Sequence, residues 1–400
     1  MISYDEALRL ILTETDGILP GTEEIILQDA LNRIIAEDVI SDINMPPFDN
    51  SAMDGYAIRF TEIKSREITG EISAGNFSNI SVDETNAVLI MTGSKIPEGA
   101  DTVAAVEDVI VSGNEIFINS DSKIKKGSNI RPLGSDLKLG ETCVYNNKVI
   151  TPAVIAVLAG CGRAKVRVYN RLKAAILATG DELIPITEKP DGDKIRATNI
   201  FALKSAISAS GHITVDCGFM KDDRNLIKDK INGLLQSDAD MLITTGGVSV
   251  GKYDFMKELF EESGVERVFW RANIKPGKPF YFGRHRKGNK TKLVFGLPGN
   301  PVSTLVNFHV YIEPALNAIF RQKERLRIPA SLTGRIKKSD GKRHFCRGVL
   351  SNGINGPEVF PLSSQSSGNY YELGNANCLI IVPENILNPK EGEILECILI

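Results

Sequence analysis

Residues 241–254 read MLITTGGVSVGKYD, which places a buried strand directly before a glycine-rich turn. Met241 to Thr244 is a short apolar run, as expected for a strand that is covered on both faces. Gly264 is placed to end the helix that follows the turn. Four apolar residues define one face of that helix: Phe255, Met256, Leu259 and Phe260. A strand, a tight turn and a helix form the unit from which α/β domains are built.

The same alternation of strand and helix extends from residue 171 to residue 327. Further strand-like runs lie at 172–178, 213–217 and 293–295. A helix face between the first two runs is defined by Ile200, Leu203 and Ile207. The pattern predicts a mostly parallel sheet that is covered by helices. Ligands of such sheets bind at the carboxyl ends of the strands, so the loops at these ends are the candidate site.

The remaining residues predict three further domains. Ser3-Tyr4-Asp5-Glu6 has the capping-box pattern and begins a helix, and residues 1–45 with 140–170 are expected to form an N-terminal helical linker domain. Short β-prone runs predict an inserted β-rich domain at 46–139, and residues 328–400 predict a small C-terminal β-barrel or sandwich. The expected fold class is therefore multi-domain α/β plus β.

Composition excludes several classes of protein. The chain has 400 residues and a net charge of −3, which argues against a general nucleic-acid binder. No apolar run reaches the ~20 residues that span a bilayer, and no signal peptide is recognisable, so we expect no membrane association and a cytoplasmic location. The six cysteines are widely spaced and the four histidines are unpaired. Reduced, mostly buried thiols are therefore expected, rather than zinc ligands or disulfides.

The glycine turn has two interpretations. Gly246, Gly247, Ser249 and Gly251 lie between a strand and a helix, where backbone N–H groups can approach an anion closely. The same glycines also suit a tight turn that needs them only for its geometry. The turn fits G-x-x-x-x-G-K, but Tyr253 replaces the Ser or Thr that would hold Mg²⁺ in a nucleotide-hydrolysing P-loop.

Two later loops are also candidates for anion binding. The stretch at 271–279, RANIKPGKP, brings the cations Arg271, Lys275 and Lys278 into one short loop, although a solvated basic turn would look the same. The stretch at 296–303, GLPGNPVS, starts a helix with Asn300 as the expected cap and Pro301 in its first turn. Its N–H groups could hold an anion, or the helix could simply be well capped.

Acidic residues are dispersed over loops and element boundaries. Each one taken singly is expected to be a cap or a solvated residue, as for Asp223 before a helix. Together they could hold a hard divalent cation, which suits chemistry on a phosphate ester or anhydride. These acids are Asp49, Asp54, Asp136, Asp181, Glu182, Asp222, Asp223 and Asp254.

Six stretches in this order resemble the molybdopterin molybdotransferase family, which includes the E domain of gephyrin-like proteins. They are PPFDNSAMDGYA (46–57), MTGSKIPEGAD (91–101), TGDEL (179–183), TTGGVSVGKYD (244–254), IKPGKP (274–279) and GLPGNPVS (296–303). The resemblance implies an elongated four-domain subunit that dimerises, with a central molybdopterin-binding-like α/β domain. It also implies that molybdate and adenylylated molybdopterin are the substrates, that AMP is released, and that Mg²⁺ is required.

The resemblance assigns roles to individual positions. It implies that Asp54, Asp136, Glu182, Asp222 and Asp254 are the functional acids, with Glu182, Asp222 and Asp254 as the metal ligands. It implies substrate contacts for the turn at 246–251. It implies further substrate contacts for Thr92, Arg271, Lys275, Lys278, Pro298, Pro301, Ser303, Arg347, Ser366 and Ser367. The choice between Ser366 and Ser367 stays open.

Two other functions fit parts of the same pattern. A molybdopterin adenylyltransferase should need only the α/β domain, so the additional domains and the KPGK loop argue against this function. A separate adenylyltransferase could instead be a partner of the chain. A non-catalytic molybdopterin-binding scaffold is the second alternative, against which the intact acids and lysines argue.

Overall fold

The computed structural model describes residues 1–400 except 76–78, 248–254 and 289. Contacts within the chain divide it into two units, and each has hydrophobic clusters of its own. The first unit comprises Met1–Glu23, Asn32–Ile34 and Tyr169–Ile400, and the second comprises Glu24–Leu31 and Ile35–Val168. In the described part of the chain, no helix has the length and apolar character needed to cross a membrane.

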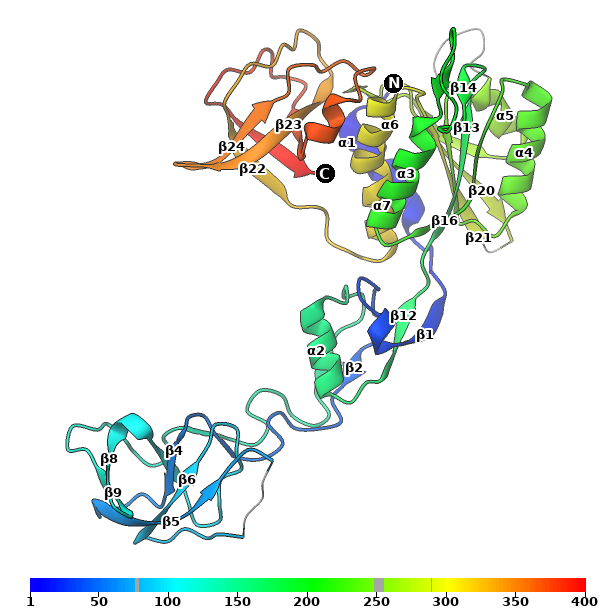
Figure 1. Cartoon of the computed structure of the whole chain (residues 1–400). Coiled ribbons are helices and arrows are strands. Elements are labelled where there is room, and N and C mark those ends of the chain that lie inside the picture. The colour runs from blue at the N-terminus through cyan, green and yellow to red at the C-terminus, as the bar shows by residue number, and fades with distance from the viewer. Residues whose placement is uncertain (76–78, 248–254, 289) are drawn as a thin grey trace. The chain divides into compact units, whose positions relative to one another are not determined.

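A six-stranded sheet forms the centre of the first unit (Figure 1). The strand order is β16-β13-β17-β21-β20-β18; the first four strands run parallel, whereas β20 and β18 continue the sheet antiparallel. The four parallel strands confirm the predicted runs, and the antiparallel pair is an addition. The bounds are β13 Lys173–Thr179, β16 Ile213–Met220, β17 Met241–Thr245, β18 Glu266–Trp270, β20 Tyr281–Lys287 and β21 Lys290–Leu297.

Helices cover both faces of this sheet, as predicted (Figure 1). Alternate strand residues explain the two layers, because Ala174 and Ile176 pack with α1, α3 and α6, whereas Ala175 and Leu177 pack with α4 and α5. The segment Phe308–Ile312, a π-helical turn, joins α6 to α7. The helix bounds are α1 Tyr4–Thr15, α3 Thr198–Ala209, α4 Arg224–Gln236, α5 Met256–Glu262, α6 Pro301–Asn307 and α7 Glu313–Ile319.

The N-terminal helix α1 has the predicted cap, since the Ser3 hydroxyl accepts a hydrogen bond from the Glu6 N–H. Its buried face packs inside the first unit. The Tyr4 ring lies 5.5 Å from the Tyr311 ring and 5.2 Å from the Phe345 ring. This helix therefore contributes to the core that joins the α/β sheet to the C-terminal strands.

The C-terminal strands close into a five-stranded barrel, because the sheet β23-β24-β22-β26-β25 also pairs β25 with β23. The predicted barrel is confirmed. A short strand, β19 (Ile274–Lys275), runs parallel to β23 and aligns Lys275 with His344. The barrel strands are β22 Arg327–Leu332, β23 Arg343–Gly353, β24 Gly356–Pro361, β25 Cys378–Val382 and β26 Ile394–Leu399.

The second unit contains a six-stranded sheet of order β7-β4-β6-β5-β9-β8. Its strands are β4 Gly55–Ile58, β5 Ser65–Ile72, β6 Asn86–Ile90, β7 Thr102–Ala105, β8 Val109–Ser112 and β9 Glu115–Ile118. Helix α2 (Pro152–Gly160) is capped at its N-terminus, because the Thr151 hydroxyl accepts the Val154 N–H. Small two-stranded ladders complete the chain: β1 (Thr22–Ile26) with β12 (Lys165–Tyr169), β2 (Val39–Ile40) with β11 (Thr142–Val144), and β3 (Asn50–Ser51) with β10 (Ile130–Arg131).

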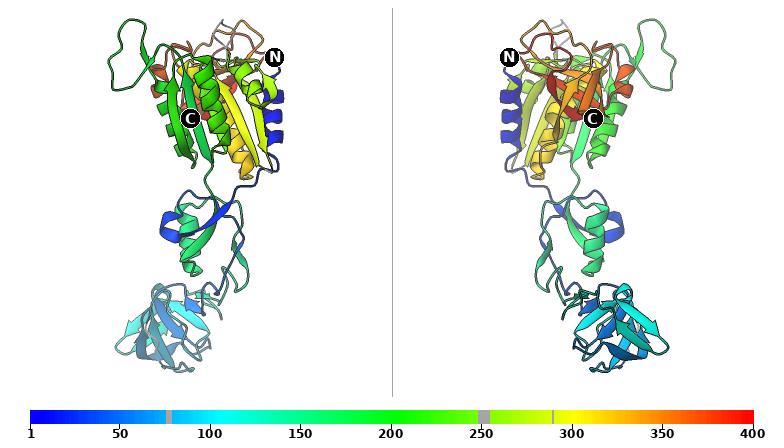
Figure 2. Two further views of the ribbon diagram at one scale, coloured as in Figure 1. Left: turned by 90° about the vertical axis from the view of Figure 1, so that its right-hand side faces the viewer. Right: turned by 90° about the vertical axis from the view of Figure 1, so that its left-hand side faces the viewer.

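Two further features bear on the site and on the cysteine prediction. Strands β14 (Leu183–Ile184) and β15 (Ile195–Arg196) pair in parallel, and the loop between them, green in Figure 2, stands out from the first unit. All six cysteines are free thiols and four are buried, so the expectation of reduced, mostly buried thiols is confirmed.

Candidate functional site

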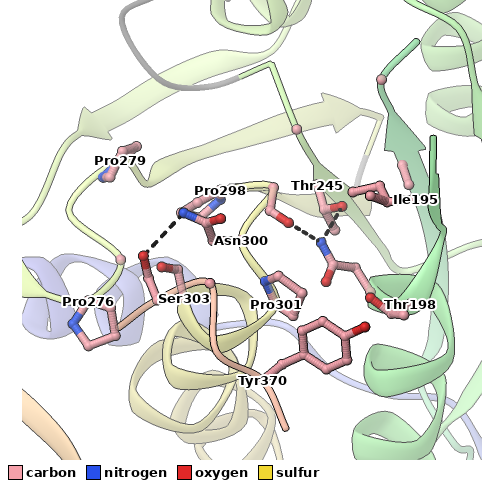
Figure 3. Close-up of a pocket in the computed structure, with 18 of the residues that line it drawn as sticks. Ile195, Thr198, Thr245, Pro276, Pro279, Pro298, Asn300, Pro301, Ser303 and Tyr370 are labelled. Atoms are coloured by element: carbon pink, nitrogen blue, oxygen red, sulfur yellow. Dashed lines mark hydrogen bonds between the residues drawn. The ribbon is translucent and has the colours of Figure 1, made fainter. Parts of the chain in front are cut away.

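A pocket of about 940 Å³ lies at the carboxyl ends of β13, β17 and β21, where the sheet topology predicts a ligand. Thr179 and Thr245 end two of these strands, and both line the pocket. The barrel domain supplies a further part of the wall through residues 365–368, Tyr370 and Lys342. Figure 3 shows Thr245, Pro298, Pro301 and Tyr370 arranged around this space.

The start of the glycine turn, at Gly246 and Gly247, lines the pocket, and the packing there leaves no room for a side chain. Gly246 has φ +96°, and a Cβ there would lie 2.3 Å from the Thr179 carbonyl oxygen. The Gly246 N–H donates to the Leu297 carbonyl, so for this residue the tight-turn interpretation is favoured over direct anion binding. Gly247 also lines the pocket, with φ +63°. Ser249, Gly251 and Asp254 lie outside the described residues.

Two of the three cations in the basic loop line the pocket: Lys275 and Lys278. A hydrogen bond from α6 fixes the turn between them, because the buried Asn307 side-chain amide donates to the Gly277 carbonyl at 3.3 Å. Gly277 has φ +99°, and a Cβ there would lie 2.8 Å from the Asn307 side chain. Arg271 is not part of the pocket wall; its guanidinium lies over the Trp270 ring, 3.9 Å from the centroid.

The turn before α6 lines the pocket with Pro298, Pro301 and Ser303. Pro301 occupies the first turn of the helix and Asn300 its N-cap position, both as predicted, but the Asn300 side chain makes no capping hydrogen bond. The Asn300 amide instead donates to the Ser367 hydroxyl at 3.2 Å (Figure 3). The side chain is thus used to tie the α/β domain to the barrel.

Ser366 and Ser367 line the pocket from the barrel, whereas Arg347 lies behind them. Arg347 is only 1% exposed, and its guanidinium donates to the carbonyls of Asn369 at 2.7 Å, Ser364 at 2.5 Å and Ser366 at 3.1 Å. Burial lowers the pKa of Arg347. Arg347 therefore holds the loop at 363–369 (the serine loop) through hydrogen bonds to its carbonyls, and it does not itself line the pocket.

Two of the predicted acids, Glu182 and Asp222, line the same pocket. The Asp181 carboxylate accepts the Asp222 N–H at 3.1 Å, which connects the loops that follow β13 and β16. Asp223 caps α4 as predicted. Within the residues that the structure describes, no group of three His, Cys, Asp or Glu side chains is arranged to hold a metal ion.

Two more of the five functional acids implied by the resemblance, Asp54 and Asp136, belong to the second unit. One oxygen of the Asp54 carboxylate accepts both the Thr92 N–H at 2.7 Å and the Thr92 hydroxyl at 2.8 Å. The backbone bond and then the side-chain bond lower the pKa of Asp54. Asp136 forms an ion pair with Arg131. The structure therefore brings Asp54 and Thr92 together, two residues that are 38 positions apart in the sequence.

Several polar residues of the pocket wall were not predicted from the sequence, among them Asn199, Arg196 and Lys342. The Asn199 amide donates to the Thr245 hydroxyl at 3.2 Å and to the Gly299 carbonyl at 2.7 Å, so it joins α3 to two of the turns (Figure 3). The only sequence signal for it was a polar residue at the start of an otherwise apolar helix face. Lys342 lies in the barrel, where no motif pointed to it.

The α/β domain, with its pocket at the strand ends, belongs to the class of probable molybdopterin binding domains, since residues 175–318 match the family model of that description. Residues 2–162 match the MoeA N-terminal region (domain I and II), and residues 329–400 match the MoeA C-terminal region (domain IV). The chain belongs to the molybdopterin molybdenumtransferase (MoeA) family.

The individual comparisons cover whole chains. The chain is 37% identical to the molybdopterin molybdenumtransferase of Haemophilus influenzae over 98% of its own length and 97% of the relative. The corresponding protein of Bacillus subtilis is 29% identical, over 100% and 94% of the two chains. The molybdopterin biosynthesis MoeA protein of Pyrococcus horikoshii OT3 superposes with a TM-score of 0.84 at 28% identity, covering both chains completely.

Proposed function

We propose that this chain is a molybdopterin molybdenumtransferase, which uses adenylylated molybdopterin and molybdate and releases AMP as it places molybdenum on the dithiolene sulfurs. The observation that carries the proposal is the pocket itself. It combines three lysines, two carboxylates and two barrel serines around the carboxyl ends of the sheet. An adenylyltransferase would need only the α/β domain, whereas here the barrel contributes part of the wall.

The cations of the pocket suit the oxyanion substrate. Lys275 and Lys278 are exposed, and their loop is held by Asn307, so their ammonium groups can meet a tetrahedral anion as point charges. Ser366 and Ser367 add hydroxyl donors from a loop that the buried Arg347 holds in place. In this proposal, these residues bind and orient molybdate, and the glycine turn provides close-packed walls for the pterin.

The two carboxylates fit Mg²⁺ as the metal ion. Mg²⁺ commonly takes one or two carboxylates, with water and substrate phosphates as its other ligands, so a complete protein cage is not required. Glu182 and Asp222 line the pocket and would hold the ion. When bound, Mg²⁺ would neutralise charge on the phosphate oxygens as the anhydride is cleaved. We further propose a cytoplasmic homodimer as the working assembly.

The proposal is tested by following AMP release from adenylylated molybdopterin, with Mg²⁺ and molybdate each present or omitted. We expect release to need both, because the oxygen ligands favour a hard cation and the lysines favour an oxyanion. Chelation followed by addition of single metals identifies the ion. Undiminished turnover in excess chelator would contradict the metal assignment.

A further inference from the structure

A third lysine, Lys342, lines the pocket from the barrel side. It precedes β23 by one residue and is half-buried, so its side chain belongs to the wall and not to the open surface. Its ammonium lies 3.2 Å from one oxygen of Asp340. The Lys275 ammonium lies 3.9 Å from the same oxygen. The two lysines, which come from different domains, therefore converge on one point beside the pocket.

Strand pairing and contacts of the neighbouring residues hold Lys342 close to Lys275. β19 pairs with β23, and the Asn273 amide donates to the Gly341 carbonyl at 2.9 Å. The next residue, Arg343, is anchored by charge: its guanidinium donates to both oxygens of Asp5, at 2.7 and 2.9 Å, and forms an ion pair with Glu384 at 3.0 Å. Lys342 is thus held between two fixed neighbours, and its side chain is the part that can respond to a ligand.

Asp340 acts as the counter-ion of both lysines. Its other oxygen accepts the His344 ring N–H at 2.8 Å and the Lys342 backbone N–H at 3.1 Å. Burial raises the pKa of Asp340, but these hydrogen bonds and that of the Lys342 side chain outweigh it and hold the pKa well below the usual value. The ionised carboxylate holds two ammonium groups near each other, which would otherwise repel.

We propose that Lys342 is a third cationic ligand of the oxyanion substrate and joins Lys275 and Lys278 across the junction of the α/β domain and the barrel. An ammonium group carries three N–H donors, and Asp340 engages the Lys342 side chain through one of them. A tetrahedral dianion bound in the pocket can take another. The inference rests on the proposed function, since it names a further residue of the same anion site.

The test uses the intact protein and inorganic molybdate alone. Equilibrium dialysis compares wild type with Lys342→Gln, with Lys342→Arg, which keeps the charge, and with Lys337→Gln. Lys337 is an exposed lysine of the same barrel outside the pocket wall and serves as the matched control. Losing a charge-assisted contact should weaken molybdate binding roughly tenfold or more in Lys342→Gln. Lys342→Arg should stay close to wild type, and Lys337→Gln should equal it.

A parallel assay separates this inference from the proposed function. In AMP release, Lys342→Gln should raise the molybdate concentration for half-maximal rate by the same factor and leave the half-saturating concentration of adenylylated molybdopterin unchanged. Molybdate binding within twofold of wild type in Lys342→Gln, or no binding by the wild type, overturns the inference. If the wild type binds molybdate but releases no AMP, the transferase proposal fails while dialysis still decides the role of Lys342.

Discussion

At the scale of single residues, Asp54 and Thr92 form a hydrogen-bonded unit whose effect on the carboxylate can be tested. Thr92→Val removes the hydroxyl donor and keeps the N–H, so the pKa of Asp54 should rise towards its usual value. A carboxylate with a lowered pKa stays ionised as the pH falls. If ionised Asp54 is needed, the acidic limb of the pH–rate profile should therefore move to higher pH in the variant.

Thr92→Ser is the matched control, because it keeps the hydroxyl and should retain the wild-type profile. The measurement is the rate of AMP release across the acidic range, with folding checked at each pH by circular dichroism. Identical acidic limbs in wild type and Thr92→Val would show that the Asp54–Thr92 bond does not control the reaction.

Lys275 should act on the oxyanion more than on the pterin. Lys275→Ala removes one charge-assisted contact, which should raise the half-saturating molybdate concentration by roughly tenfold to a hundredfold. The rate of AMP release is measured against molybdate and, separately, against adenylylated molybdopterin. A collapse of pterin binding with unchanged molybdate dependence would reassign the loop to the phosphates of the pterin.

At the scale of elements, local pattern predicted the parallel strands but not all of their neighbours. β13, β17 and β21 are apolar runs, so their burial is visible in the sequence. The later half of β20 is charged, at Arg284 to Lys287, and β24 contains Pro357 and Pro361, which argue against a strand. These strands form because tertiary pairing supplies partners that no local signal reveals.

The site could be predicted only in part, because some of its residues reach the pocket through pairing between domains. Glu182 and the turn before α6 directly follow strands of the parallel sheet, where topology alone places a ligand, and Lys275 and Lys278 belong to a basic stretch that the sequence shows. Lys342 comes from a separate domain, and only the pairing of β19 with β23 brings it to the pocket. The hydrogen bond from the Asn300 side chain to Ser367 of the barrel could not be predicted either. An Asn before a helix looks the same in sequence whether its side chain caps the helix or contacts another domain.

The serine loop at 363–369 should depend on the buried guanidinium of Arg347. Arg347→Lys keeps the charge but loses the planar fork that reaches three carbonyls, so the loop should open and molybdate affinity should fall. Limited proteolysis with mass analysis locates cleavage in the loop, and dialysis measures molybdate binding. Arg335→Lys, an exposed position in the same barrel, is the control. An intact loop with unchanged binding would refute the supporting role.

At the scale of the whole molecule, the proposed homodimer makes a quantitative prediction. In the proposed homodimer, we expect Asp54 of one subunit to share a site with Lys275 of its partner. At a molybdate concentration well below the wild-type half-saturating value, Asp54→Ala should be nearly inactive and Lys275→Ala should keep at most about a tenth of the activity. In a refolded equal mixture, half the dimers are mixed and each has one intact site, so about a quarter of wild-type activity should return. Activity no higher than that of the separate variants, with mixed dimers confirmed by mass, would exclude a shared site.

A molybdenum-loaded cofactor is the product that the proposed reaction should yield, and this product can be measured. Purified protein is incubated with adenylylated molybdopterin, Mg²⁺ and molybdate, and the released pterin is analysed for bound molybdenum and supplied to a cofactor-free molybdoenzyme. We expect one molybdenum per AMP released and restoration of the molybdoenzyme's activity, both lost when molybdate is omitted. AMP release without molybdenum on the pterin, or no AMP release at all, would contradict it.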